Sequence, residues 1–369
     1  MRIAGWTWTI LVLLAQPTLG DPISLVIGGF YHAVEKTANT IGDVAGGAVL
    51  LAGTGLIKFR EEIRCRLYEC CSEPYIIPNF YNMKAALERN VYGQHLVLDT
   101  VWNAVMAHWK VPNPRKPLVL TFHGYTGTGK NHVSRQIVEN IYKNGMRSSF
   151  VHHIVATSEY PDRSRMDEYQ LKLRERILSA AKKCERAIFI FDEIDKMPEQ
   201  LLSSIKPFLD YYDQVLEVDF RRSIFIFLSN QGGATIANIA KDHHLAGKNR
   251  EDLTLKHFEG PVMKEAFNKE GGLKMSELIT SQLIDHFVPF LPLERQHVVS
   301  CTEDYLRTRG RHDLAAEPEF VDKIVDSLEY FPKGAPVFSS SGCKRIAQKA
   351  ELEMNKRKPP HSLDGPDEL

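Results

Sequence analysis

One segment constrains the fold of this chain more than any other. It runs Gly124-Tyr125-Thr126-Gly127-Thr128-Gly129-Lys130-Asn131 and matches the pattern G-x-x-x-x-G-K. An uncharged apolar run, residues 118–122, precedes it, and residues 130–142 follow with helical spacing. In a strand–loop–helix unit of this kind, glycines let backbone N–H groups surround a phosphate, and the helix N-terminus adds its positive dipole end. The segment therefore predicts a loop that binds the phosphates of a nucleotide, with Lys130 reaching the β- and γ-phosphates.

The position after Lys130 departs from the usual pattern. Asn131 stands where Ser or Thr normally ligates magnesium. An amide oxygen can hold a metal ion directly or through a water molecule. We therefore expect residues 124–131 to bind ATP with magnesium, in an altered metal geometry.

Polar side chains follow two later apolar runs. Asp192 and Glu193 come directly after residues 188–191, and Asn230 follows residues 224–228 with Ser229 between them. Parallel sheets place ligands at the carboxyl ends of their strands, so these side chains are expected beside the phosphates. Asp192 is predicted to hold magnesium, Glu193 to act as the general base that polarises the attacking water, and Asn230 to orient that water. Asp195 and Lys196 are interpreted as a local surface pair.

The order of predicted elements indicates an α/β fold. Uncharged apolar runs that fit buried strands alternate with runs that fit helices of ten to fifteen residues, which predicts a parallel sheet flanked by helices. The predicted strands are residues 118–122, 151–156, 187–191 and 224–228, and the predicted helices between them are residues 130–142, 167–181 and 200–211. After residue 293 the pattern changes to helices only, with residues 319–328 and 341–354 as the clearest, which predicts a small all-helical domain.

The N-terminus carries two apolar segments. Residues 1–20 have the layout of a secretory signal peptide: Arg2, an uncharged apolar run at residues 3–15, and a breaker before Gly20. A retained anchor is the alternative, although the run is short for a membrane span. Residues 21–59 are rich in Gly, Ala, Val and Leu. They are interpreted as a membrane-associating arm, with an ordinary buried hairpin as the alternative, and whether the arm enters the bilayer stays open.

The remaining chain divides into three predicted parts. These are a large nucleotide-binding domain at residues 60–293, the small helical domain at residues 294–355, and a flexible tail at residues 356–369. The tail ends in Pro366-Asp367-Glu368-Leu369, which is similar to a C-terminal retrieval signal of the endoplasmic reticulum except at its first position. Chance similarity of an acidic tail is the alternative.

Charge and cysteine content narrow the functional classes. Lys and Arg together number 46, as do Asp and Glu, so the formal net charge is zero and gives no case for nucleic acid as the main partner. The six cysteines are an even number, which is consistent with disulfides in an oxidising compartment. The connectivity of Cys65, Cys70, Cys71 and Cys184 does not follow from the sequence.

Lys130, Asp192-Glu193 and Asn230 occur in the order of the Walker A, Walker B and sensor 1 elements of AAA+ ATPases. Within that class the chain resembles the torsin family, over roughly residues 60–350. The longer motifs that carry this resemblance are the Asn after the P-loop Lys and residues 191–197, 206–212, 287–294 and 342–344.

The resemblance implies a location and two further site elements. It implies an ATPase of the lumen of the endoplasmic reticulum and nuclear envelope (the perinuclear space), associated with the membrane through its N-terminal arm. It also implies that Gly342-Cys343-Lys344 is the sensor 2 region, with Lys344 near the γ-phosphate and Cys343 as a redox-responsive partner of Cys301. Without the resemblance, Cys343 would be interpreted as a small buried residue and Lys344 as a surface charge.

An expected arginine is missing. In Clp-related AAA+ proteins, the segment before the final strand carries an arginine that inserts into the neighbouring ATP site, and Leu283 stands in that place here. Such an arginine is worth about 10³–10⁵ in rate, so slow or absent hydrolysis by the chain alone is predicted. The resemblance implies that a membrane-anchored luminal activator with an ATPase-like fold supplies it, in a homo-oligomer or a mixed ring. Arg221 and Arg222 are the in-chain alternative. Tyr160-Pro161 is only a weak candidate for a pore loop.

Two functions from different classes fit these features. The leading hypothesis is an activator-dependent Mg-ATPase that remodels proteins or membrane-associated assemblies. The alternative is a nucleotide-gated binding module with little turnover. Glu193 favours the first, whereas Asn131 and Leu283 are compatible with the second. The substrate, the ring stoichiometry and the direction of any force do not follow from the sequence.

Overall fold

The computed structural model describes residue 65, residues 68–334 and residues 336–357. The predicted signal peptide, the N-terminal arm and residues 366–369 lie outside the described residues. The chain divides into a unit that ends at Cys70 and a second unit that begins at Cys71. Within the first unit a disulfide joins Cys65 and Cys70, and the elements below all belong to the second. In the described part of the chain, no helix is both long and apolar enough to cross a membrane.

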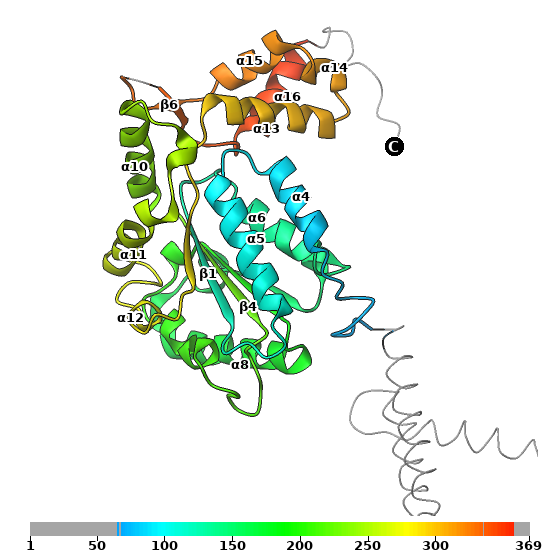
Figure 1. The fold of residues 1–369 in the computed structure, drawn as a ribbon, viewed down its shortest axis with the longest axis vertical. Coiled ribbons are helices and arrows are strands. Elements are labelled where there is room, and N and C mark those ends of the chain that lie inside the picture. The colour runs from blue at the N-terminus through cyan, green and yellow to red at the C-terminus, as the bar shows by residue number, and fades with distance from the viewer. Residues whose placement is uncertain (1–64, 66–67, 335, 358–369) are drawn as a thin grey trace, which may run out of the picture. The chain divides into compact units, whose positions relative to one another are not determined.

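The second unit is built around a parallel five-stranded sheet in the order β2-β3-β4-β1-β5 (Figure 1). Its strands are β1 (Leu118–His123), β2 (Val151–Val155), β3 (Ile188–Asp192), β4 (Ile224–Ser229) and β5 (His286–Pro289). The four strands predicted from apolar runs are confirmed. The central strands β1 and β4 are buried along their whole length, as expected for a sheet covered on both faces.

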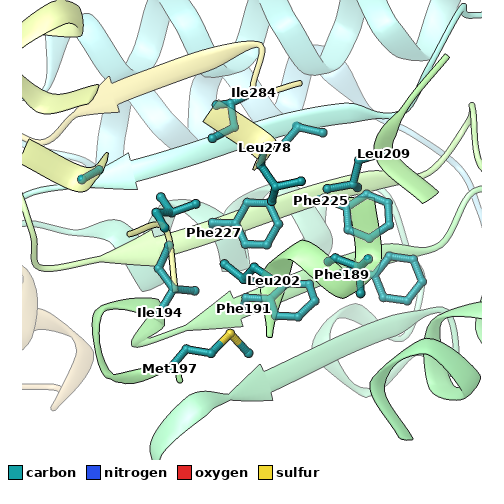
Figure 2. Packing of buried hydrophobic residues seen from close by; sticks show 14 of the residues in the cluster. Phe189, Phe191, Ile194, Met197, Leu202, Leu209, Phe225, Phe227, Leu278 and Ile284 are labelled. Atoms are coloured by element: carbon teal, nitrogen blue, oxygen red, sulfur yellow. The ribbon is translucent and has the colours of Figure 1, made fainter. Parts of the chain in front are cut away.

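Alternate residues of each strand serve the two faces of the sheet. On one face, Leu120, Ile190 and Ile226 pack with α4 (Phe80–Asn90), α5 (His95–Lys110) and α6 (Lys130–Glu139). On the other, a cluster that includes α8 (Met166–Lys183), α10 (Gly233–Leu245) and α11 (Glu259–Asn268) covers a set of phenylalanines. Figure 2 shows these rings, Phe189, Phe191, Phe225 and Phe227, side by side. The Phe189 and Phe225 ring centres are 4.7 Å apart, and those of Phe191 and Phe227 are 5.0 Å apart.

Helices α13 (Arg295–Thr308), α14 (His312–Ala315), α15 (Pro318–Asp326) and α16 (Ile346–Lys356) follow the sheet and enclose a core of their own. The prediction of helices only after residue 293 is wrong in one detail. Strands β6 (Tyr330–Phe331) and β7 (Phe338–Ser339) form a short antiparallel pair between α15 and α16. Aromatic residues favour extended backbone, and Phe331 and Phe338 pack on each other across this pair.

The predicted helix at residues 200–211 is shorter than expected. A 3₁₀ turn (Leu202–Ile205) leads into α9 (Lys206–Leu209), with Pro207 in its first turn. Asp210 then adopts an extended conformation, which ends the helix. The remaining short helices are α7 (Ala156–Glu159) and α12 (Glu277–Thr280).

Candidate nucleotide site

The glycine-rich loop lies between β1 and α6, at the carboxyl edge of the sheet. Gly129 has a left-handed conformation with φ +107°, which turns the chain into the first turn of α6. Lys130 is buried, and its Nζ donates hydrogen bonds to the carbonyl oxygens of Gly124 (2.6 Å) and Tyr125 (3.0 Å) and to Oδ1 of Asn230 (3.1 Å). Burial lowers the pKa of Lys130 to about 8. The structure thus brings the predicted Walker lysine and the predicted sensor 1 amide into direct contact.

The loop is braced from within by a side chain. The Thr128 hydroxyl donates to the carbonyl oxygen of Tyr125 at 2.8 Å, and the Tyr125 ring packs edge-on against Phe331 at 5.9 Å between ring centres. A β-carbon added to Gly124 would lie 2.6 Å from the carbonyl oxygen of Phe290, so this position requires glycine.

Asp192 and Asn131 meet at the same edge. Asn131 Nδ2 donates to Asp192 Oδ2 at 2.5 Å, and His153 Nε2 lies 3.8 Å from the same oxygen. Burial raises the pKa of Asp192, but hydrogen bonds from His153, Asn131 and the Glu193 backbone N–H outweigh burial and hold that pKa below its ordinary value. Asp192 is therefore a carboxylate at neutral pH.

This pair of side chains fits magnesium. The part of the chain that the structure describes holds no cluster of three or more His, Cys, Asp or Glu residues that could bind a metal ion. Magnesium bound with nucleotides, however, needs only one or two protein oxygens besides phosphate and water. The Asn131 amide holds Asp192 through its nitrogen, which leaves its oxygen as the atom that can ligate a cation.

Glu193 occupies a constrained turn after β3. Its backbone is left-handed with φ +56°, which is uncommon for a residue other than glycine. The Thr157 hydroxyl, just after the carboxyl end of β2, donates to Glu193 Oε2. The sequence analysis missed Thr157, although a polar residue at the end of a parallel strand is the same signal that identified Asp192 and Asn230.

Asp195 is a correction to the sequence analysis. Its side chain is only 8% exposed, and its Oδ1 accepts a hydrogen bond from the backbone N–H of Asn230 at 3.0 Å. Lys196 lies 3.8 Å from the other carboxylate oxygen. Asp195 therefore fixes the Asn230 backbone beside Lys130, in addition to pairing with Lys196.

The turn at residues 341–344 packs directly on the glycine-rich loop. The Cys343 backbone N–H donates to the Gly127 carbonyl oxygen at 3.1 Å, and Lys344 Nζ lies 3.4 Å from Thr126 Oγ1. A β-carbon on Gly127 would lie 2.0 Å from the Ser341 carbonyl oxygen, and one on Gly342 would lie 2.2 Å from the Gly127 carbonyl oxygen. Two backbones touch here because neither glycine has a side chain.

A disulfide joins Cys343 in this turn to Cys301 on α13. A cavity of about 790 Å³ opens between these parts, within the size range of small-molecule sites. The glycine-rich loop forms its floor, residues 90–92 before α5 form one wall, and α13 and the start of α16 form the other. Of the described residues that line the cavity, none is an arginine.

Comparisons with known proteins identify the family of this chain. The Torsin family model matches residues 65–191, and the Torsin-1A C-terminal domain model matches residues 293–352. The chain is 52% identical over 315 residues to a torsin-like protein of Caenorhabditis elegans. This alignment covers 85% of this chain and 88% of that protein. The chain belongs to the torsin family. This torsin is also 37% identical to a torsin-like protein of Drosophila melanogaster (96% and 98% covered) and 36% identical to Torsin-3A of Rattus norvegicus (79% and 74% covered).

Solved structures of Hsp104 share the fold of this torsin. The Hsp104–ADP complex of S. cerevisiae and a closed-state Hsp104 with ATPγS and FITC-casein each align with a TM-score of 0.53, at 18% and 16% identity. Each alignment covers 75% of this chain and 47% of the Hsp104 chain, so this torsin spans about half the length of Hsp104. The AAA+ fold is shown, and family membership supports an ATPase of the torsin type.

Leu283 lies inside the protein. It is 1% exposed in the core beneath the sheet, and its carbonyl oxygen accepts a hydrogen bond from Lys116 Nζ at 3.0 Å.

Arg221 and Arg222 precede β4, at the amino end of a strand whose carboxyl end leads to Asn230. Arg221 pairs with Asp213 and Asp219, and Arg222 pairs with Glu185. The strand thus separates both arginines from the nucleotide site of their own chain.

Tyr160 does not form an exposed pore loop. It is 6% exposed, and its ring packs edge-on against Tyr169 at 5.2 Å between centres. The sequence feature that was a weak candidate is a core contact.

Proposed function

We propose that this torsin is a luminal AAA+ ATPase whose hydrolysis depends on a membrane-anchored activator that supplies an arginine. The carrying observation is that Lys130 contacts Asn230 and Asn131 contacts Asp192 at the edge of the sheet where Glu193 follows β3, next to a cavity whose described lining contains no arginine. The activity remodels proteins or membrane-associated complexes of the endoplasmic reticulum and nuclear envelope. Assembly into a homo-oligomer or a mixed ring with the activator completes the site.

Each predicted site residue has a role in this proposal. Lys130 replaces its present carbonyl partners with the β- and γ-phosphates, and Lys344, which lies beside Thr126 of the same loop, approaches the γ-phosphate. Asp192 and Asn131 would hold magnesium, which would neutralise phosphate charge when bound. Glu193 takes a proton from the attacking water, and Asn230, held by Asp195, orients that water.

The cysteines support the luminal location. All six cysteines of the sequence are paired, as Cys65–Cys70, Cys71–Cys184 and Cys301–Cys343. Such pairing is typical of oxidising compartments and rare in the cytosol. It agrees with the predicted signal peptide at residues 1–20 and with membrane association through residues 21–59. We retain residues 60–293 and 294–355 as the proposed large and small domains and residues 356–369 as the tail.

Turnover of ATP with and without the luminal domain of an activator tests the function. We expect stimulation of about 10³–10⁵, the value of an arginine finger supplied by a partner. An activator in which the candidate arginine is replaced by Ala should bind without stimulating. Absence of stimulation by the intact activator while ATP is bound would favour the alternative, a nucleotide-gated binding module with little turnover.

The Cys301–Cys343 disulfide is expected to influence nucleotide affinity. It anchors the turn at residues 341–344, in which the Cys343 backbone contacts Gly127. Loss of the disulfide therefore releases the turn that covers the phosphate-binding loop. We expect Cys301→Ser/Cys343→Ser to weaken ADP binding roughly fivefold, equivalent to about 1 kcal/mol, as measured by titration calorimetry. The matched control is Cys65→Ser/Cys70→Ser, which removes a disulfide outside the cavity lining. Equal affinity in both variants would make Cys301 and Cys343 purely structural.

A further inference from the structure

A tyrosine and an aspartate join the two walls of the nucleotide cavity. Tyr92 belongs to the segment between α4 and α5, and its hydroxyl donates a hydrogen bond to Asp304 Oδ2 on α13. Both residues line the cavity. The Asp304 side chain is 39% exposed, which places the contact at the rim of the cavity. Burial and the Asp304 carboxylate raise the pKa of Tyr92, so the phenol remains a donor at physiological pH.

The segment that carries Tyr92 is held firmly at its other side. The buried Gln94 donates to the carbonyl oxygens of Thr128 (3.1 Å) and Leu291 (2.8 Å) and accepts from the Leu291 N–H (2.8 Å). Gln94 thereby ties the wall to the phosphate-binding loop and to the chain that leads into α13. These hydrogen bonds hold residues 91–94, the segment that carries Tyr92, in a fixed position.

Arg250 also holds this segment in position. Its guanidinium donates to the Gly93 carbonyl oxygen at 2.6 Å and to Glu294 Oε1, at the start of α13, at 3.1 Å. Arg250 thus links the start of α13 to residues 91–94. Asp304 lies nine residues along the helix from Arg295. Beyond the start of α13, the Cys301–Cys343 disulfide and the hydrogen bond from the Tyr305 hydroxyl to Glu351 on α16 hold the rest of the helix in place. The Tyr92–Asp304 contact therefore opens by rotation of these two side chains.

We propose that the Tyr92–Asp304 contact is a latch that must open for a nucleoside triphosphate to enter or leave the cavity. The proposal rests on the proposed function, since it assigns the cavity to a nucleotide. The contact joins the two walls whether or not a nucleotide lies between them, so passage in either direction requires it to open, and only the fraction of molecules with an open latch exchanges nucleotide. Removal of the latch raises that fraction and accelerates both entry and exit.

The rates of association and dissociation of ribose-labelled fluorescent ATP test this latch by stopped flow. For Tyr92→Phe we expect both rate constants to rise together, by roughly tenfold, because one hydrogen bond to a carboxylate is lost. The dissociation constant is expected to change much less than either rate. Asp304→Asn should behave similarly, and the double variant should be no faster than the faster single variant.

Two matched controls separate the latch from general effects. Tyr81→Phe removes a hydroxyl from a tyrosine that is 84% exposed on α4. Glu303→Gln removes a neighbouring acid that shares Arg307 with Asp304 but makes no bond to Tyr92. Both controls should exchange nucleotide at the wild-type rates.

The possible outcomes distinguish the two proposals. Faster dissociation of Tyr92→Phe with unchanged association would show an ordinary contact to the nucleotide and would overturn the latch, as would unchanged rates or additive effects in the double variant. If the wild-type chain bound labelled ATP no better than Lys130→Ala, the proposed function would fail, and the latch would fail with it.

Discussion

Glu193→Gln is expected to lower activator-stimulated ATP hydrolysis by about 10²–10⁴ while ATP remains bound, which is the usual contribution of a general base. Glutamine has the shape of glutamate but cannot take a proton from water. The roles proposed for Lys130 on phosphate and for Asp192 on magnesium involve neither carboxylate oxygen of Glu193, so we expect binding to be retained. The variant should also hold its protein partners longer, because the step that resets the nucleotide state is blocked.

Single-turnover hydrolysis and nucleotide content after purification measure these two effects separately. Glu175→Gln is the matched control, since Glu175 is exposed on α8, away from the cavity lining. Hydrolysis at the wild-type rate by Glu193→Gln, or rapid release of partners in the presence of ATP, would contradict the assignment of Glu193 as the base. A pull-down with this variant from its native compartment would also identify the substrate.

The second large effect concerns stability. Cys71 and Cys184 are 113 residues apart in sequence, and their disulfide ties the beginning of the second unit to the end of α8. A cross-link over a loop of this length restricts the unfolded chain by about 5 kcal/mol in the chain-entropy description. We expect Cys71→Ala/Cys184→Ala to lower the free energy of unfolding by about 4 kcal/mol, measured by urea denaturation under non-reducing conditions.

The comparison variant is Cys65→Ala/Cys70→Ala. That disulfide closes a loop of only 5 residues and lies in the first unit, so the main unfolding transition should barely move. Equal midpoints for the two double variants would show that Cys71–Cys184 does not restrict the unfolded state of the second unit.

The sequence was most informative where a site residue closely follows a predicted strand in the chain. The uncharged runs before Gly124, Asp192 and Asn230 have the length and composition of buried strands, and a parallel sheet brings the ends of such strands together. In the structure, Lys130 contacts Asn230 and Asn131 contacts Asp192 at that edge of the sheet. The roles of these residues in catalysis remain predictions.

Other parts of the site depend on contacts between distant segments, which local patterns do not encode. Asp195 was interpreted as a surface residue because the neighbouring sequence does not show that its side chain accepts a hydrogen bond from the backbone N–H of Asn230, 35 residues later. Tyr92 and Asp304 are 212 residues apart, and neither belongs to a recognisable motif. Lys344 was placed near the phosphates only through the resemblance to torsins, since its own sequence context is that of a surface charge.

The contact between Gly127 and Gly342 determines how this protein can be divided for study. A fragment that ends before residue 341 would contain every Walker residue and the sensor 1 asparagine, yet the backbone that covers the phosphate-binding loop would be missing. Lys344 meets Thr126 across 218 residues of sequence, so the smallest piece that retains the whole lining of the proposed nucleotide cavity extends to within thirty residues of the C-terminus. Nucleotide affinity measured on a shorter piece would describe a half-open pocket rather than a domain.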